Sequence, residues 1–104
     1  MTHDQIVAEI QARADTRGIF SHYCRRSVRC AGTPGMPDLL LVGREAVAWL
    51  EVKTAGDQLK PDQTRWMYRL RAVGQVHEVI HAADLNPGGA VDQMLDFITT
   101  GEAA

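Results

Sequence analysis

Three charged residues stand in or beside short apolar runs of this 104-residue chain. Asp38 opens a run at residues 39–42, and Glu51 and Lys53 lie near the end of a second run at residues 46–53. The tight turn between the two runs predicts an antiparallel hairpin, which brings Asp38 close to Glu51 or Lys53. Glu51 and Lys53 are two residues apart, so they project from one face of their strand. Two carboxylates beside an ammonium group could hold a divalent cation and hydrolyse phosphodiesters.

Each of these residues also has a purely structural interpretation. Asp38 follows Pro37 and can simply cap a turn. Glu51 and Lys53 can form a solvated pair on an edge strand, which is the commoner role of an isolated Glu-x-Lys sequence. Only the surrounding elements and a wider motif can distinguish the two interpretations.

Apolar periodicity and turn residues predict the elements that must position these side chains. The first half of the chain is expected to form a helix at residues 4–17, an extended segment at 18–29, a loop at 31–37, and the hairpin strands at 38–42 and 46–53. A polar loop at 54–60, a helix from Pro61 to residue 73, a strand at 75–81 and a helix at about 90–99 follow. Trp66, Leu70 and Val73 are the expected apolar stripe of the helix that begins at Pro61. The order α-β-β-β-α-β-α predicts an α/β fold in which helices flank a mixed β-sheet. Residues 1–104 are expected to form a single domain.

Composition narrows the class of protein. Apolar residues make up 45% and charged residues 23%, which is typical of a globular chain and excludes a disordered one. No stretch approaches the ~20 apolar residues that a membrane span requires, and the N-terminus has no apolar leader. The two cysteines, Cys24 and Cys30, are too few for a disulfide framework and lack the paired spacing of a zinc site. We therefore expect a cytoplasmic protein that does not associate with membranes.

The net charge of −2 conceals an uneven distribution of charge along the chain. Residues 13–29 contain five arginines and one aspartate, and residues 57–71 contain more cations than aspartates. Such segments suit a phosphate-binding face, although a mild basic cluster is more often a solvated surface.

The ordered set of residues around the hairpin resembles the PD-(D/E)xK nuclease superfamily, and within it the virus-type replication-repair nuclease (VRR-NUC) domain. The resemblance covers about residues 4–85. It is carried by Gly35-Met36-Pro37-Asp38-Leu39, Glu51-Val52-Lys53-Thr54, Gln63 followed by Trp66, and Leu70 ahead of Gly74. It implies a restriction-endonuclease-like fold.

The resemblance also implies a role for each matching residue. Asp38 and Glu51 would be catalytic metal ligands, the backbone carbonyl of Val52 a further ligand, and Lys53 would assist the nucleophile. The remaining matches are Gln63, which would lie beside the active centre as a catalytic residue, and Glu9, the acidic residue of the first helix and a candidate metal ligand. Glu9 can equally pair with Arg13 four residues later.

By this resemblance the protein would be an Mg²⁺-dependent DNA endonuclease, with Mn²⁺ as a substitute and no small-molecule cofactor. It would act as a homodimer in a phage or prophage setting, on a branched substrate such as a four-way junction or a flap. Arg25, Arg26 and Arg29 would hold nucleic-acid phosphates. Two alternatives stay open: a catalytically silent nucleic-acid-binding or assembly protein with the same fold, and a nuclease that acts on RNA.

Overall fold

The computed structural model describes residues 1–24 and 31–102. Its elements are, in order, α1 (His3–Thr16), β1 (Phe20–Tyr23), β2 (Leu39–Val42), β3 (Val47–Val52), α2 (Pro61–Ala72), β4 (Val76–Ile80), the 3-10 helix η1 (Ala82–Leu85) and α3 (Ala90–Thr100). The predicted order α-β-β-β-α-β-α is confirmed. The short η1 is the one described element that apolar periodicity did not predict, because it completes less than two turns.

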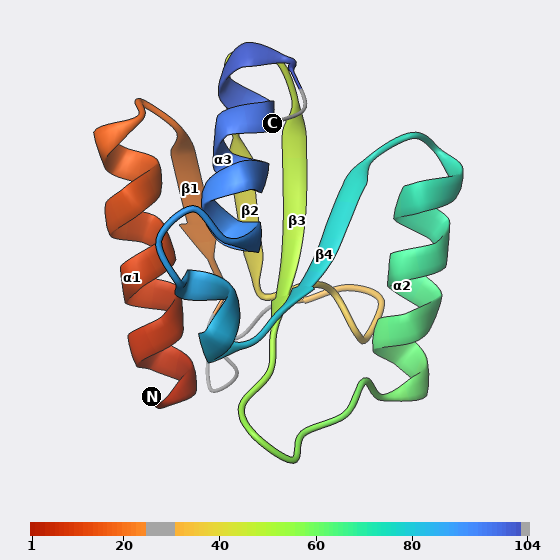
Figure 1. Ribbon diagram of the computed structural model, residues 1–104. Helices are drawn as coiled ribbons and strands as arrows, with labels where there is room; N and C mark the ends of the chain where they lie inside the picture. Colours follow the sequence, from red (N-terminus) through yellow and green to blue (C-terminus); the bar gives the residue numbers. More distant parts are fainter. Residues whose placement is uncertain (25–30, 103–104) are drawn as a thin grey trace.

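The four strands form one mixed sheet in the order β1-β2-β3-β4 (Figure 1). The pairs β1–β2 and β2–β3 are antiparallel, and the pair β3–β4 is parallel. A parallel pair needs a crossover connection, and α2 provides it. The sheet therefore has the hairpin at its centre and one crossover at its β4 side.

The helix α1 begins at His3, directly after Thr2, which caps its N-terminus. The Thr2 hydroxyl accepts a hydrogen bond from the Gln5 backbone N–H, and the Gln5 side chain accepts one from the Thr2 backbone N–H. This reciprocal pair satisfies two donors that the first helical turn would otherwise leave unpaired. The helix ends at Thr16, ahead of Gly18 with its positive φ of 72°.

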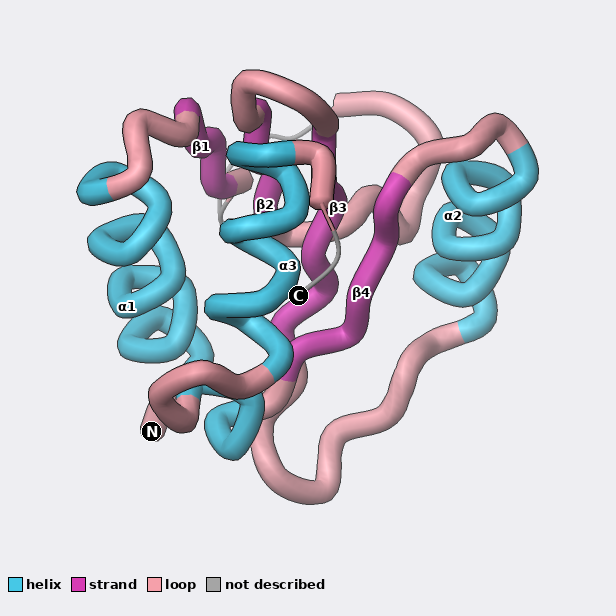
Figure 2. The backbone as a smooth tube through the Cα atoms, turned by 45° about the horizontal axis from the view of Figure 1, so that its top comes forward, coloured by secondary structure: helices cyan, strands magenta, loops and turns pink. Residues whose placement is uncertain are grey.

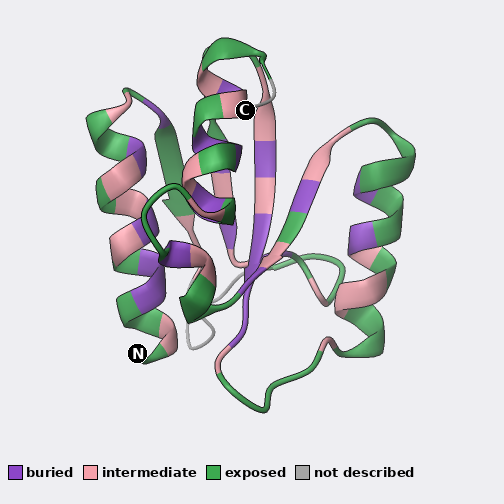
Figure 3. Cartoon of the chain, in the orientation of Figure 1, coloured by how far each residue is buried: buried purple, intermediate pink, exposed green. Residues whose placement is uncertain are grey.

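The main hydrophobic core lies between one face of the sheet and the helices α1 and α3; Figure 1 shows α3 in front of the strands and α1 beside β1. Figure 3 shows the buried positions of these elements in purple. The core residues come from every layer: Ile6, Val7, Ile10, Ala14, Ile19, Leu39, Leu41, Ala48, Leu50, Val52, Ile80, Leu85, Val91, Met94, Leu95 and Ile98. None of the helices in the described ranges is long and apolar enough to cross a membrane.

The helix α2 lies beside β4, apart from α1 and α3 (Figure 2). Its buried residues are Met67 and Leu70, whereas Val73 is 66% exposed and Trp66 is only half-buried. The predicted apolar stripe was therefore right at Leu70 and wrong at Val73. Residues three apart are offset by about 60° around a helix, so a helix packed on a sheet edge can bury the side of Met67 and Leu70 and leave Val73 outside.

His77 on β4 is a buried titratable group on this side of the sheet. Its side chain is 3% exposed, and within the described residues its Nδ1 has no hydrogen-bond partner. Burial lowers the pKa of His77 below its usual 6.5, and the positive charge of Arg71 lowers this pKa further. A neutral imidazole is thus the form that the fold favours.

The protein is expected to lose stability as the pH falls below about 6.5, because the unfolded chain takes up a proton at His77 before the folded protein does. The free energy of unfolding should fall by at most about 1.4 kcal/mol per pH unit between 6.5 and the lower folded-state pKa. His77→Leu should weaken this dependence, and His22→Gln, at an exposed position, should not. Urea unfolding at about pH 5 to 8 measures it; identical pH profiles for His77→Leu and wild type would contradict the assignment.

Candidate active site at the end of the β2–β3 hairpin

Asp38 lies directly before β2, at the end of the hairpin remote from its turn. The register pairs Leu39 with Leu50, so the next pair outward places Asp38 opposite Glu51. The Val52 backbone N–H donates a 2.9 Å hydrogen bond to Asp38 Oδ2. The prediction that the hairpin brings Asp38 to the end of the second strand is therefore confirmed.

Glu51 and Lys53 are both only 2% exposed. Glu51 lies on β3 and Lys53 directly follows it. Because β3 lies inside the sheet, between β2 and β4, the interpretation as a solvated pair on an edge strand was wrong. Ala48, Leu50 and Val52 point into the main core, and alternation along the strand turns Glu51 and Lys53 to the opposite face. A charge this deeply buried requires a polar partner, since its desolvation is costly.

Gln63 in the first turn of α2 supplies that partner for Lys53. Lys53 Nζ donates a 2.8 Å hydrogen bond to Gln63 Oε1. The same Gln63 oxygen accepts a 2.9 Å hydrogen bond from the Lys60 backbone N–H, which fixes the amide at the start of the helix. The structure thus brings together Lys53 and Gln63, two residues that are ten apart in sequence and that the motif singled out.

The loop ahead of β2 is attached to α2 by two close contacts. Trp66 Nε1 donates a 2.9 Å hydrogen bond to the Pro34 carbonyl and lies 3.3 Å from the Thr33 carbonyl. Gly35 has a φ of +96°, and a Cβ at this position would lie 2.4 Å from the Asp62 carbonyl carbon. The glycine of the motif is therefore required both by backbone conformation and by the close approach of α2.

His3 at the start of α1 also contacts the site, and sequence reasoning missed it. His3 Nε2 lies 3.0 Å from Asp38 Oδ2, and the Tyr23 hydroxyl lies 3.2 Å from His3 Nδ1. Tyr23 in turn donates a 2.9 Å hydrogen bond to Asp4 Oδ1. The contact crosses 35 residues of sequence, and no spacing rule would have found it.

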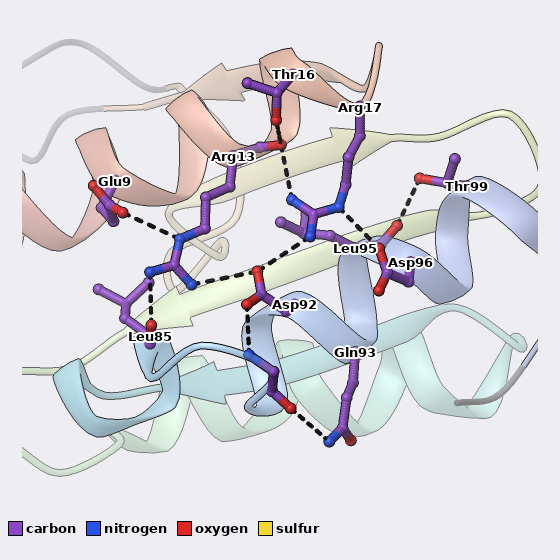
Figure 4. A network of polar contacts seen from close by, with 11 residues as sticks. Glu9, Arg13, Thr16, Arg17, Leu85, Asp92, Gln93, Leu95, Asp96 and Thr99 are labelled. Atoms are coloured by element: carbon purple, nitrogen blue, oxygen red, sulfur yellow. Dashed lines mark hydrogen bonds and ion pairs between the residues drawn. The ribbon is translucent and has the colours of Figure 1, made fainter.

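Glu9 takes part in a different cluster, which Figure 4 shows between α1 and α3. Glu9 Oε1 accepts a 3.1 Å hydrogen bond from Arg13 Nε, the i,i+4 pair that the sequence left open. Arg13 continues to the Leu85 carbonyl at 2.6 Å and to Asp92 at 3.3 Å, and Asp92 also pairs with Arg17 at 3.2 Å. The described contacts thus place the Glu9 carboxylate in a network that joins two helices, and its metal-binding role stays a prediction.

Asp92 is the centre of this network (Figure 4). The Gly88 backbone N–H donates a 2.9 Å hydrogen bond to Asp92 Oδ2 and is the main cause that lowers the pKa of this carboxyl, with smaller contributions from Arg13 and Arg17. The Asp92 carboxylate is therefore stabilised in its charged form at the N-terminal turn of α3, where the helix dipole also favours a negative charge. Its role is to hold α1, η1 and α3 together.

The donor set at the hairpin suits some cations better than others. Within residues 1–24 and 31–102, no three His, Cys, Asp or Glu side chains are arranged to hold a metal ion. A closed four-ligand zinc site is therefore absent from this part of the chain. Mg²⁺ commonly binds one or two carboxylates and keeps water and phosphate oxygens as its other ligands, so Asp38, Glu51 and the Val52 carbonyl fit such an ion. The predicted phosphate-binding residues Arg25, Arg26 and Arg29 lie outside the described residues.

The chain is similar to known proteins both in sequence family and in fold. The VRR-NUC domain model matches residues 3–84. Two solved structures share the fold: a "VRR_NUC domain", with a TM-score of 0.63, 22% identity and 92% of each chain covered, and a "VRR_NUC domain protein", with a TM-score of 0.62, 19% identity, and 94% of this chain and 85% of the other covered. Comparison with curated proteins finds no match. The family match spans most of the chain and includes the hairpin, Gln63 and the start of α1: the chain belongs to the VRR-NUC family of nuclease-like domains.

Proposed function

We propose that this protein is an Mg²⁺-dependent endonuclease, with Mn²⁺ as a substitute, that hydrolyses DNA phosphodiester bonds in branched structures such as a four-way junction or a flap. The observation that carries the proposal is the burial of Lys53, whose ammonium group donates a hydrogen bond to Gln63. Glu51, two residues earlier, is equally buried, and Asp38 lies opposite Glu51 at the end of the hairpin. Buried charges reduce stability unless they are well paired, and clusters of them are concentrated at functional sites.

Each residue has a defined task in this mechanism. Asp38, Glu51 and the Val52 carbonyl would hold the cation, which when bound polarises a phosphoryl oxygen and lowers the pKa of a bound water. Asp38 is kept in place for this by the Val52 N–H and by His3. Lys53 would stabilise the negative charge that develops on the phosphate and orient the attacking water. Gln63 is a positioning residue, because it fixes the Lys53 ammonium group.

The test is cleavage of a substrate panel by purified protein with Mg²⁺, with Mn²⁺ and with EDTA. The panel contains blunt duplex, flap, four-way junction and single-stranded DNA, and a matched RNA set. Cleavage of branched DNA that EDTA abolishes supports the proposal. Binding of DNA without cleavage of any substrate would favour the silent nucleic-acid-binding protein, and cleavage confined to RNA would favour the RNA nuclease.

DNA binding is expected to depend on the arginine-rich segment that leads into the loop ahead of β2. Replacing Arg25, Arg26 and Arg29 together by glutamine should weaken DNA binding at low salt, reduce the dependence of affinity on salt concentration, and leave divalent-cation binding unchanged. A gel-shift titration at several salt concentrations measures this. Unchanged affinity of the triple variant at low salt would remove these arginines from the DNA-binding surface.

The biological setting and the assembly of the protein are proposed on the family resemblance. They comprise a homodimer, which would present two sites to one branched substrate, a phage or prophage source, and activity in the cytoplasm of the host cell. Light scattering coupled to gel filtration measures the oligomeric state directly. A monomer at working concentration would contradict the proposed homodimer and leave the nuclease proposal in place.

A further inference from the structure

A cavity of about 220 Å³ lies between α2 and the loop that leads into β2. Six residues line it: Thr33, Pro34, Asp62, Arg65, Trp66 and Arg69. None of these residues takes part in the contacts of Asp38, Lys53 and Gln63 described above. The cavity is therefore a separate feature of the molecule.

The cavity adjoins the candidate active site through α2. Asp62, Arg65, Trp66 and Arg69 recur at spacings of three and four residues, so they share one face of the helix. Gln63, next to Asp62 in the same turn, points to Lys53 instead. The cavity and the Lys53–Gln63 contact thus lie on different sides of the first turns of α2.

The aromatic wall of the cavity is fixed before any ligand binds. The hydrogen bonds from Trp66 Nε1 to the Pro34 and Thr33 carbonyls hold the edge of the indole against the loop. The contact of Gly35 with the Asp62 backbone prevents the loop from moving closer. A held indole beside a proline offers a flat apolar surface at little entropic cost on binding.

The charges at the cavity favour an anion. Two guanidinium groups and one carboxylate line it, and the carboxylate of Asp62 pairs only loosely with Arg65, at 3.5 Å. The Arg65 side chain is 78% exposed, and Arg69 is also exposed. An arginine can bind a phosphate with two hydrogen bonds. Because Arg65 and Arg69 are exposed, they can bind a phosphate without breaking a buried contact.

We propose that the cavity binds one unpaired nucleotide of the DNA substrate, with its base against Trp66 and Pro34 and its phosphate on Arg65 and Arg69. The proposal rests on the proposed nuclease function and names the feature of the substrate that the enzyme recognises. In a continuous duplex each base is stacked and cannot offer its face to an indole, whereas an unpaired base can. The cavity therefore selects DNA with a flap, a junction or a single-stranded end over intact duplex.

Tryptophan fluorescence tests the proposal without requiring cleavage. The chain has two tryptophans, so Trp49→Phe leaves Trp66 as the sole fluorophore of this type. Without divalent metal, a short single-stranded oligonucleotide should quench Trp66, and a blunt duplex of two fully paired strands of the same length should not. Equal quenching by both, or quenching by neither, overturns the proposal.

Variants then test which residues bind the nucleotide. Arg65→Gln/Arg69→Gln and Trp66→Ala should each weaken single-strand binding, the latter about 5- to 150-fold, and bring it close to duplex binding. Trp66→Phe, which keeps an aromatic ring and loses the Nε1 hydrogen bonds, should bind more tightly than Trp66→Ala. Arg44→Gln is the matched control, because this exposed arginine lies at the turn of the hairpin, at the end remote from Asp38.

The outcomes separate this proposal from the nuclease proposal. Selective single-strand binding that depends on Arg65, Arg69 and Trp66 supports the cavity assignment even if the protein cuts no substrate. Cleavage of branched DNA with unchanged single-strand affinity in the Arg65→Gln/Arg69→Gln protein overturns the cavity assignment and leaves the nuclease in place.

Discussion

Asp38→Asn and Glu51→Gln proteins are each expected to fold and to lose DNA cleavage in Mg²⁺ by a factor of about 10³ or more. Either change removes an anionic ligand, and the charge stabilisation by a bound cation contributes several kcal/mol, at about 1.4 kcal/mol per tenfold change in rate. Folding should persist in Asp38→Asn because the new amide oxygen can still accept the hydrogen bond that the Val52 N–H now donates to the carboxylate. In Glu51→Gln the new side chain keeps the volume of the buried glutamate.

Single-turnover cleavage and calorimetric Mn²⁺ titration on the same preparations measure this prediction. Glu45→Gln is the matched control, because this exposed acid lies at the turn of the hairpin, away from the site. The control should cleave and bind Mn²⁺ as the wild type does. Full activity of Asp38→Asn or Glu51→Gln, with an unchanged melting temperature, would disprove the proposed site.

Lys53→Met is expected to slow single-turnover cleavage by about 10²–10⁴ and to change DNA affinity little. The range is that of a positioned proton-transfer or charge-stabilising group, and the variant loses one of eleven cations. Methionine keeps the apolar stem in the buried position and lacks the ammonium group. Gln63 Oε1 would still accept a hydrogen bond from the Lys60 N–H, so the start of α2 should stay intact.

Gln63→Leu completes a double-mutant cycle for this pair. If Gln63 acts only through Lys53, its replacement should cost less rate than Lys53→Met, and the double variant should be no slower than Lys53→Met alone. Additive losses would instead give Gln63 a catalytic role of its own. A lysine with a purely structural role predicts a fall in the free energy of unfolding for Lys53→Met with no selective loss of rate.

Much of the fold could be predicted because it depends on local patterns. Ile6, Val7, Ile10 and Ala14 repeat with the period of a helix, and they are the buried residues of α1. The two apolar runs about a tight turn predicted a hairpin with Asp38 close to Glu51 or Lys53, and the observed register places Asp38 opposite Glu51. The predicted hairpin and the element order were therefore confirmed, because periodicity and turn chemistry act over a few residues.

The sequence by itself determined which residues are the candidates for the chemistry: Asp38, Glu51 and Lys53 were identified by type and spacing, and Gln63 by the family resemblance. Only the tertiary structure decided the surroundings of these residues. It brought His3 into contact with Asp38 and paired Arg13 with Asp92. It also directed the Trp66 indole to the Pro34 carbonyl instead of the core, and it formed the cavity beside α2. The physical reason is that these contacts join segments tens of residues apart, and their geometry depends on how helices pack on the sheet, which no local spacing encodes.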